Sequence, residues 1–197
     1  MYRPNADVDK RNSEMLDNLA TEEQQVVIKS LDSISGQTRH INLSTLSEKR
    51  SETGGIHGTL KLAIGARVML TANLDVSDGL VNGARGTVVE FITNSTGIFV
   101  KILILFDNPS VGKTAMRSNQ STQHGDAVPL KKHEVTFLCK NKRGSEITRV
   151  QFPLTLAWAT TIHKVQGLTL DEIVVDMEGG KKFNAGQAYV AFSRVKT

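Results

Sequence analysis

A series of short apolar segments between residues 64 and 151 constrains the fold of this chain most strongly. The segments around IGARVML, TVVEFI, GIFVKILILF, HEVTFLC and ITRVQF are rich in β-branched and aromatic residues. Gly, Asn and Ser separate them, and TNST joins the second segment to the third. Short strands separated by turns are typical of a small antiparallel barrel or sandwich. We therefore predict a β domain over residues 64–151, with one long loop at 107–134.

The residues before this β domain have a helical pattern. Residues 13–31 carry apolar side chains at helical spacing, with a second helix start at Thr21; these are Met15, Leu16, Leu19, Val26, Val27 and Leu31. Residues 32–58 are rich in Ser, Thr, Gly and charge, which predicts a surface connection with room for a short strand.

The residues after Phe152 return to an α/β pattern. A helix is predicted from Pro153 to Gly167, because Pro is tolerated in a first turn and Gly often follows a last one. Its apolar stripe consists of Leu154, Trp158, Ile162 and Val165. The apolar run at residues 173–177 predicts a short buried strand, and the pattern at residues 185–194 predicts a final helix. The β domain is therefore predicted to be inserted between residues 1–63 and 152–197 of an α/β domain.

Composition narrows the class of protein. The 39% hydrophobic and 22% charged residues are ordinary for a globular chain. No run approaches the roughly 18 apolar residues of a membrane span, and the first residues lack the apolar core of a signal peptide. We therefore expect no membrane partner and no secretion. The single cysteine excludes an internal disulfide framework, which favours a reducing compartment.

Positive charge is concentrated in one part of the chain. Residues 101–150 contain nine Lys or Arg and four Asp or Glu, a local balance of +5 against +4 for the whole chain. A basic segment suits a phosphate backbone, although a solubilising surface has the same composition.

Polar residues crowd the side of the predicted C-terminal helix opposite its apolar stripe. Thr160, His163, Lys164 and Gln166 can donate hydrogen bonds to phosphate, sugar or base edges. A solvated helix face has the same composition. His163 has no second ligand at a suitable spacing, so no metal site is predicted.

The pattern A-x-A-x-T-I-H-K-x-Q-G-x-T-L at residues 157–170 resembles motif V of superfamily-one helicases, in the PIF-type, RecD-related branch of 5′-to-3′ DNA helicases. The resemblance implies DNA contacts by Thr161, His163, Lys164 and Gln166, and a nucleotide contact by Gly167.

The sequence GQAYVAFSRV at residues 186–195 is similar to motif VI of the same family, with Phe192 where the family has Leu. Gln187 and Arg194 are seven residues apart and share a helix face. The resemblance implies that both contact ATP, with Arg194 as an arginine finger on the γ-phosphate. The alternative is a structural arginine paired with a carboxylate.

The resemblance extends upstream over nearly the whole chain. Residues 4–16 are similar to the segment after motif IV, with Pro4 in place of the family's Thr, and residues 64–91 resemble the entry into an SH3-like barrel. The implied fold is a partial RecA-like domain, the second lobe of a P-loop NTPase, with an inserted small antiparallel SH3-like β-barrel. By the same resemblance the barrel contacts DNA, and Lys131 and Lys132 lie in its basic segment.

The first lobe of such a helicase is not found in the sequence. No GxxxxGK[ST] occurs, and Asp107 stands where the SVGKT at residues 110–114 would need its first glycine. We therefore expect the C-terminal portion of an ATP-dependent DNA helicase, inactive by itself, which shares ATP and Mg²⁺ with an N-terminal lobe. Single-stranded DNA or DNA junctions are the expected partners, and the nucleus, or alternatively the mitochondrion, the expected compartment. The rival hypotheses are a stand-alone single-stranded DNA-binding module and an inactive remnant.

Overall fold

The computed structural model describes residues 5–34, 52–119, 123–139, 145–161, 173–175, 186, 189 and 192–195. The chain divides into two compact units, one of Met1–Leu19 with Leu156–Thr197 and one of Ala20–Thr155. Helices and antiparallel sheets are both present, so the fold is of the mixed α/β kind.

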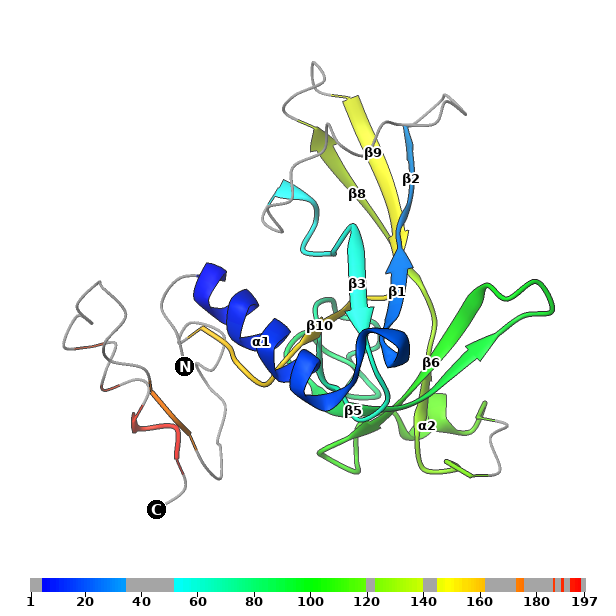
Figure 1. The fold of residues 1–197 in the computed structure, drawn as a ribbon. Coiled ribbons are helices and arrows are strands. Elements are labelled where there is room, and N and C mark those ends of the chain that lie inside the picture. The colour runs from blue at the N-terminus through cyan, green and yellow to red at the C-terminus, as the bar shows by residue number, and fades with distance from the viewer. Residues whose placement is uncertain are drawn as a thin grey trace. The chain divides into compact units, whose positions relative to one another are not determined.

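A five-stranded sheet forms the core of the unit Ala20–Thr155 (Figure 1). Its strand order is β10-β4-β5-β6-β7. The bounds are β4 Arg67–Leu70, β5 Arg85–Thr93, β6 Phe99–Phe106, β7 Val128–Leu130 and β10 Leu154–Leu156. Ile102, Leu103 and Ile104 of β6 are fully buried, because this strand has a neighbour on each side and is covered on both faces.

The turn between β5 and β6 is set by Asn94 and Gly97. The Asn94 side chain accepts hydrogen bonds from the backbone N–H groups of Thr96 (3.1 Å) and Ile98 (2.9 Å). Gly97 has a φ of 78°, which glycine adopts without a steric cost. The predicted hairpin across TNST is therefore confirmed.

Two smaller sheets complete the same unit. β1 (Val26–Lys29) pairs with β3 (Thr59–Leu62), and β9 (Ser145–Gln151) lies between β2 (Leu31–Ile34) and β8 (His133–Cys139). Strands from before residue 64 thus belong to the same compact unit, Ala20–Thr155, as the strands at 64–151.

The prediction of a second helix start at Thr21 is wrong. One 3-10 turn, η1 (Glu22–Gln24), is followed directly by β1 and β2. The backbone N–H of Thr21 donates to Gln24 Oε1 at 3.0 Å and closes this turn. The β-branched run Val26, Val27 and Ile28 then favours a strand, because such side chains are restricted in helices and fit a pleated sheet.

The long loop predicted at 107–134 contains regular structure. A short helix, α2 (Lys113–Met116), and strand β7 lie within it. The β7 strand has only three residues and owes its conformation to pairing with β6, from Ile102 opposite Leu130 to Ile104 opposite Val128.

The other unit contains α1 (Asn5–Leu19), which agrees with the predicted helical pattern over residues 13–19 but begins eight residues earlier. Val8 and Leu16 lie on its buried side, with 6% and 2% of their surface exposed. Near the C-terminus, Gly186, Tyr189 and Phe192 are helical. The N–H of Ser193 donates to the Tyr189 carbonyl at 2.9 Å, as expected for the predicted final helix.

The start predicted for the helix at Pro153 is wrong. Leu154–Leu156 form strand β10 beside β4, and the chain bends at Trp158 and Ala159. The N–H of Thr71 donates to the Pro153 carbonyl at 2.9 Å, so sheet pairing overrides the helical spacing. The strand predicted at 173–177 is not formed at the three residues described there, and Val174 is 80% exposed.

Candidate nucleic-acid interface

A buried asparagine of α1 fixes the chain just before the predicted DNA-contact segment. Asn12 is 4% exposed, and its Nδ2 donates to the carbonyl oxygens of Leu156 (3.3 Å) and Ala159 (3.1 Å). The N–H of Ala159 donates to Asn12 Oδ1 at 2.7 Å. The side-chain amide therefore binds the backbone where regular sheet pairing has ended.

Two threonines follow this anchor directly. Thr161, predicted to contact DNA, is 7% exposed, so its hydroxyl is largely covered. The Thr160 hydroxyl is also buried and has no hydrogen-bond partner in the part of the chain that the structure describes. From their polar residue types alone, these threonines were expected on an exposed helix face.

Most of the predicted contact residues lie outside the described residues. These are His163, Lys164, Gln166, Gly167 and Gln187. Their predicted roles stay predictions.

Arg194 lies at the end of the C-terminal helical residues and is partly exposed. Its Nη2 and Nε donate to the Ser193 hydroxyl at 3.0 and 3.3 Å. Among the described residues it has no carboxylate partner, which leaves the guanidinium able to bind an oxyanion.

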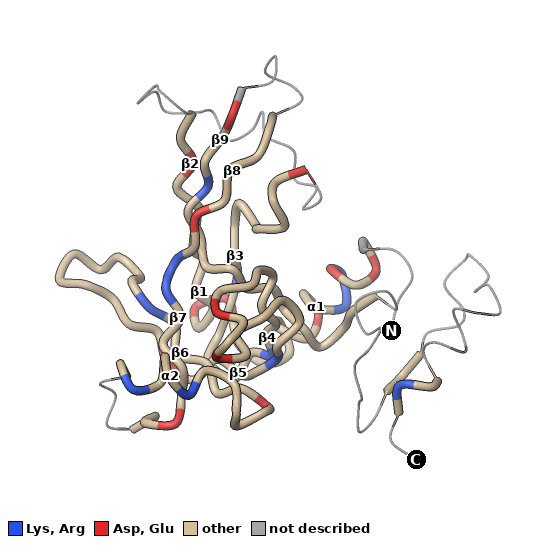
Figure 2. Tube along the Cα trace, turned by 180° about the vertical axis from the view of Figure 1, so that it is seen from behind, with Lys and Arg blue, Asp and Glu red and all other residues tan. Residues whose placement is uncertain are grey.

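Lys131 and Lys132 lie between β7 and β8. Lys131 is exposed, whereas Lys132 is partly buried with its Nζ 5.8 Å from the centre of the Phe152 ring. Figure 2 shows Lys and Arg residues spread along β6, α2 and this connection, with acidic residues between them. The positive charge of this region is therefore distributed and not gathered on one strand.

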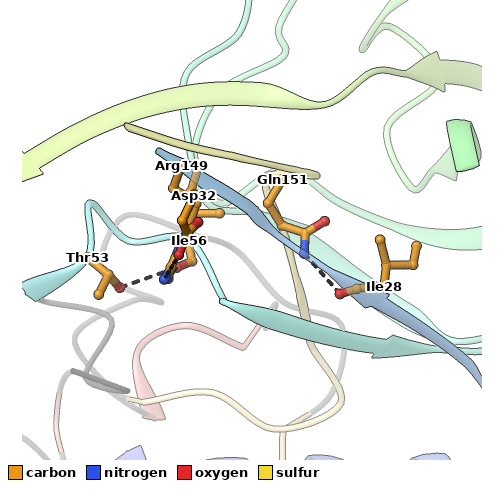
Figure 3. Close-up of polar contacts among 6 residues, drawn as sticks. All are labelled: Ile28, Asp32, Thr53, Ile56, Arg149 and Gln151. Carbon is orange, nitrogen blue, oxygen red and sulfur yellow. Dashed lines mark hydrogen bonds and ion pairs between the residues drawn. The ribbon is translucent and has the colours of Figure 1, made fainter. Parts of the chain in front are cut away.

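One arginine of the basic segment points into the interior. Arg149 donates from Nε and Nη2 to the two carboxylate oxygens of Asp32 (2.9 and 2.7 Å), and from Nη1 to the Ile56 carbonyl (3.1 Å; Figure 3). Because Asp32 neutralises it in the core, this arginine adds no positive charge to the surface. A count of charged residues along the sequence therefore assigns the surface one positive charge too many.

Two further arginines lie on one face of the five-stranded sheet. Arg67 donates to Thr87 Oγ1 (2.9 Å) and forms a two-point ion pair with Asp107, which raises the pKa of Arg67. Arg85 has a buried Nε and Nη2 without partners among the described residues, and burial followed by the Arg67 charge lowers its pKa. Two guanidinium groups and one carboxylate leave one net positive charge here. No local sequence pattern marks Arg67 and Arg85 as a pair, since only strand register brings them together.

The phosphate-loop-like sequence at residues 110–114 binds an internal carboxylate. Asp78 accepts hydrogen bonds from the backbone N–H groups of Thr114 (2.8 Å) and Ala115 (3.0 Å). The first of these bonds is the main cause of the lowered pKa of Asp78. The N–H groups that a phosphate would need are thus taken by Asp78, in agreement with the missing first glycine.

Two further kinds of site are absent from the described residues. These residues contain no group of three or more His, Cys, Asp or Glu side chains placed to hold a metal ion. None of the described helices has the length and hydropathy to cross a bilayer.

Sequence comparison places these features in a family. Residues 54–91 match the profile described as DNA helicase Pif1, 2B domain. The chain is 41% identical over 138 residues to the ATP-dependent DNA helicase PIF1 of Danio rerio, covering 70% of this chain and 18% of that protein. It is 36% identical over 177 residues to the ATP-dependent DNA helicase Pif1 of Bdellovibrio bacteriovorus, covering 89% of this chain and 32% of that protein.

Solved structures give the same result. The Pif1 helicase of Candida albicans matches with a TM-score of 0.66 and 27% identity, over 98% of this chain and 42% of that one. A Bacteroides Pif1 helicase in complex with ADP-AlF3 and single-stranded DNA matches with a TM-score of 0.62 and 27% identity, over 100% of this chain and 38% of that one.

The fold and the sequence matches define a chain of the DNA helicase class. Within that class it belongs to the PIF1 family. It spans between 18% and 32% of the length of the two relatives described above.

Proposed function

We propose that this chain is the second RecA-like lobe, with its inserted SH3-like barrel, of an ATP-dependent 5′-to-3′ DNA helicase. In this proposal it contributes single-stranded DNA contacts and an arginine finger. The observation that carries the proposal is the match over the full chain to a Pif1 helicase whose complex contains both a nucleotide analogue and single-stranded DNA. By resemblance, the proposed compartment is the nucleus or the mitochondrion.

The proposed DNA contacts come from both compact units. Lys131 offers an exposed ammonium to the phosphate backbone, and Lys132 adds charge beside it. His163, Lys164 and Gln166 supply hydrogen bonds from the motif V segment. Thr161, which is only 7% exposed, is the fourth proposed contact of this segment.

Arg194 is the proposed arginine finger. Its guanidinium bonds only to the Ser193 hydroxyl among the described residues, so no carboxylate competes with a γ-phosphate. Gln187 and Gly167 are proposed to contact the same nucleotide. An arginine in this role stabilises the charge that develops during phosphoryl transfer.

The remaining part of the ATP site is assigned to another lobe. The 197 residues contain no GxxxxGK[ST], the pattern that holds the phosphates and the Mg²⁺ ligand of such sites. We therefore propose that a P-loop lobe holds the metal and the phosphates, and that this chain alone does not hydrolyse ATP. The missing P-loop pattern also favours a second candidate function, a module that binds single-stranded DNA without a motor.

An ATPase assay on a two-lobe protein tests the arginine finger. The chain would be joined to the P-loop lobe of a Pif1 helicase, and DNA-stimulated turnover measured with and without Arg194→Ala. We expect turnover to fall by about a thousandfold or more, the range found for arginine fingers. Arg11→Ala is the matched control, because Arg11 forms an exposed ion pair with Glu14 on α1.

A decrease below about tenfold for Arg194→Ala is too small for a finger and would contradict the assignment. DNA-stimulated hydrolysis by the 197-residue chain alone would contradict the division of the ATP site between two lobes.

A further inference from the structure

We propose that Asn12 is a positioning residue for DNA binding, which sets the backbone of residues 156–159 directly before the motif V contact residues. This inference rests on the proposed function, since it concerns the presentation of the motif V segment to DNA. Asn12 itself touches no DNA in this proposal.

The position of Asn12 on α1 is the first part of the argument. Val8, Asn12 and Leu16 are spaced four residues apart, so they lie on one side of the helix, and all three are buried. A buried amide in an apolar stripe destabilises a protein unless its polar atoms are hydrogen-bonded. Here the partners lie 144 and 147 residues away in the sequence.

The pattern of hydrogen bonds is the second part. Ala159 donates its N–H to Asn12 Oδ1 and accepts from Nδ2 at its carbonyl, so one side chain satisfies both backbone polar groups of this residue. A neighbouring strand would provide the same pair of bonds. β10 ends at Leu156 and the chain bends at 158 and 159, so the Asn12 amide acts in place of a strand partner.

The surroundings of the next residues are the third part. The Thr160 hydroxyl is buried and has no partner among the described atoms, so it does not fix this segment. Ala159 is 6% exposed, and its backbone groups would be desolvated and unpaired without Asn12. The backbone conformation of residues 156–159 therefore depends on the Asn12 side chain.

The test compares Asn12→Ala with Asn18→Ala, an exposed asparagine of the same helix. Two quantities are measured on the 197-residue chain: hydrogen exchange at the Ala159 amide and affinity for a single-stranded oligonucleotide. Leaving buried groups unpaired costs about a factor of ten or more, so we expect Asn12→Ala to raise exchange and lower affinity each by about tenfold. Asn18→Ala should change neither.

Asn12→Asp separates positioning from a general decrease in stability. A carboxylate facing two carbonyl oxygens is repelled by them, whereas the protonated acid can donate to one and still accept from Ala159. Burial raises the pKa of such a carboxyl, so we expect the affinity of Asn12→Asp relative to wild type to recover between about pH 8 and pH 5. Asn12→Ala should show no recovery over the same range.

Faster exchange at Ala159 with unchanged DNA affinity would make Asn12 a purely structural residue and would overturn the proposal. So would equal affinity ratios for Asn12→Asp at both pH values. Absence of DNA binding by the wild-type chain would instead overturn the proposed function, and exchange at Ala159 would then still decide whether Asn12 sets this backbone.

Discussion

Asp32 and Arg149 show how the surroundings of single residues decide the value of an ion pair. Their side chains are 0% and 4% exposed, and Arg149 also lies 5.4 Å from the centre of the Phe137 ring. The Arg67–Asp107 pair has the same two-point geometry, but its side chains are 35% and 48% exposed. A buried pair leaves an uncompensated charge when one partner is removed, whereas water compensates an exposed one.

We therefore expect Asp32→Asn to lower the free energy of unfolding by about 3–5 kcal/mol, because Arg149 would keep its charge without a counter-ion. Urea unfolding followed by circular dichroism measures this value. Asp107→Asn is the matched control and should cost about 1 kcal/mol or less. Equal decreases for the two variants would show that burial does not distinguish the pairs.

At the scale of elements, α2 depends on a carboxylate from a distant turn. It has only four residues, too few for a stable helix by propensity alone. Asp78 accepts the N–H groups of Thr114 and Ala115, and the N–H of Gly112 donates to the Asp78 carbonyl at 2.7 Å. These bonds hold the helix against the turn formed by residues 75–80.

The lowered pKa of Asp78 predicts a dependence of stability on pH. Its folded pKa lies below the ordinary value of 3.8, so its contribution is fully present above pH 3.8 and disappears as pH falls through the folded pKa. Asp78→Asn should therefore lower Tm at neutral pH, and the difference from wild type should shrink below pH 3.8. Thermal unfolding followed between neutral and acidic pH measures this difference.

Asp126→Asn provides the comparison, since Asp126 is an exposed carboxylate close to β7. It should leave Tm nearly unchanged at both pH values. A Tm difference for Asp78→Asn that grows as pH falls would have the wrong sign for a carboxylate stabilised by backbone N–H groups.

At the scale of the whole molecule, the sequence predicted those elements whose pattern is local. The strands β5, β6, β8 and β9 carry β-branched residues between turn residues, and α1 has helical spacing. The sequence did not predict β7 and β10. These strands have three residues each and form because they pair with β6 and β4. Contacts between distant residues, such as Asn12 with Ala159 and Arg149 with Asp32, leave no local pattern to detect.

The same limit applies to the candidate site. Motif VI pointed to Arg194, which has no carboxylate partner among the described residues, and the basic segment pointed to Lys131, which is exposed. Motif V also pointed to Thr161, whose burial could not be inferred from its residue type. Side-chain exposure is set by packing against the rest of a unit, and a single sequence does not contain that information.

Affinity for single-stranded DNA as a function of salt tests the central claim most directly. Fluorescence anisotropy of a labelled oligonucleotide with the 197-residue chain would supply the measurement. We predict that log K falls linearly with log salt concentration, and that Lys131→Ala with Lys132→Ala reduces the slope by about 0.7 for each phosphate that is no longer neutralised. Absence of binding at about 50 mM salt, or an affinity independent of salt, would contradict a role in holding the DNA backbone.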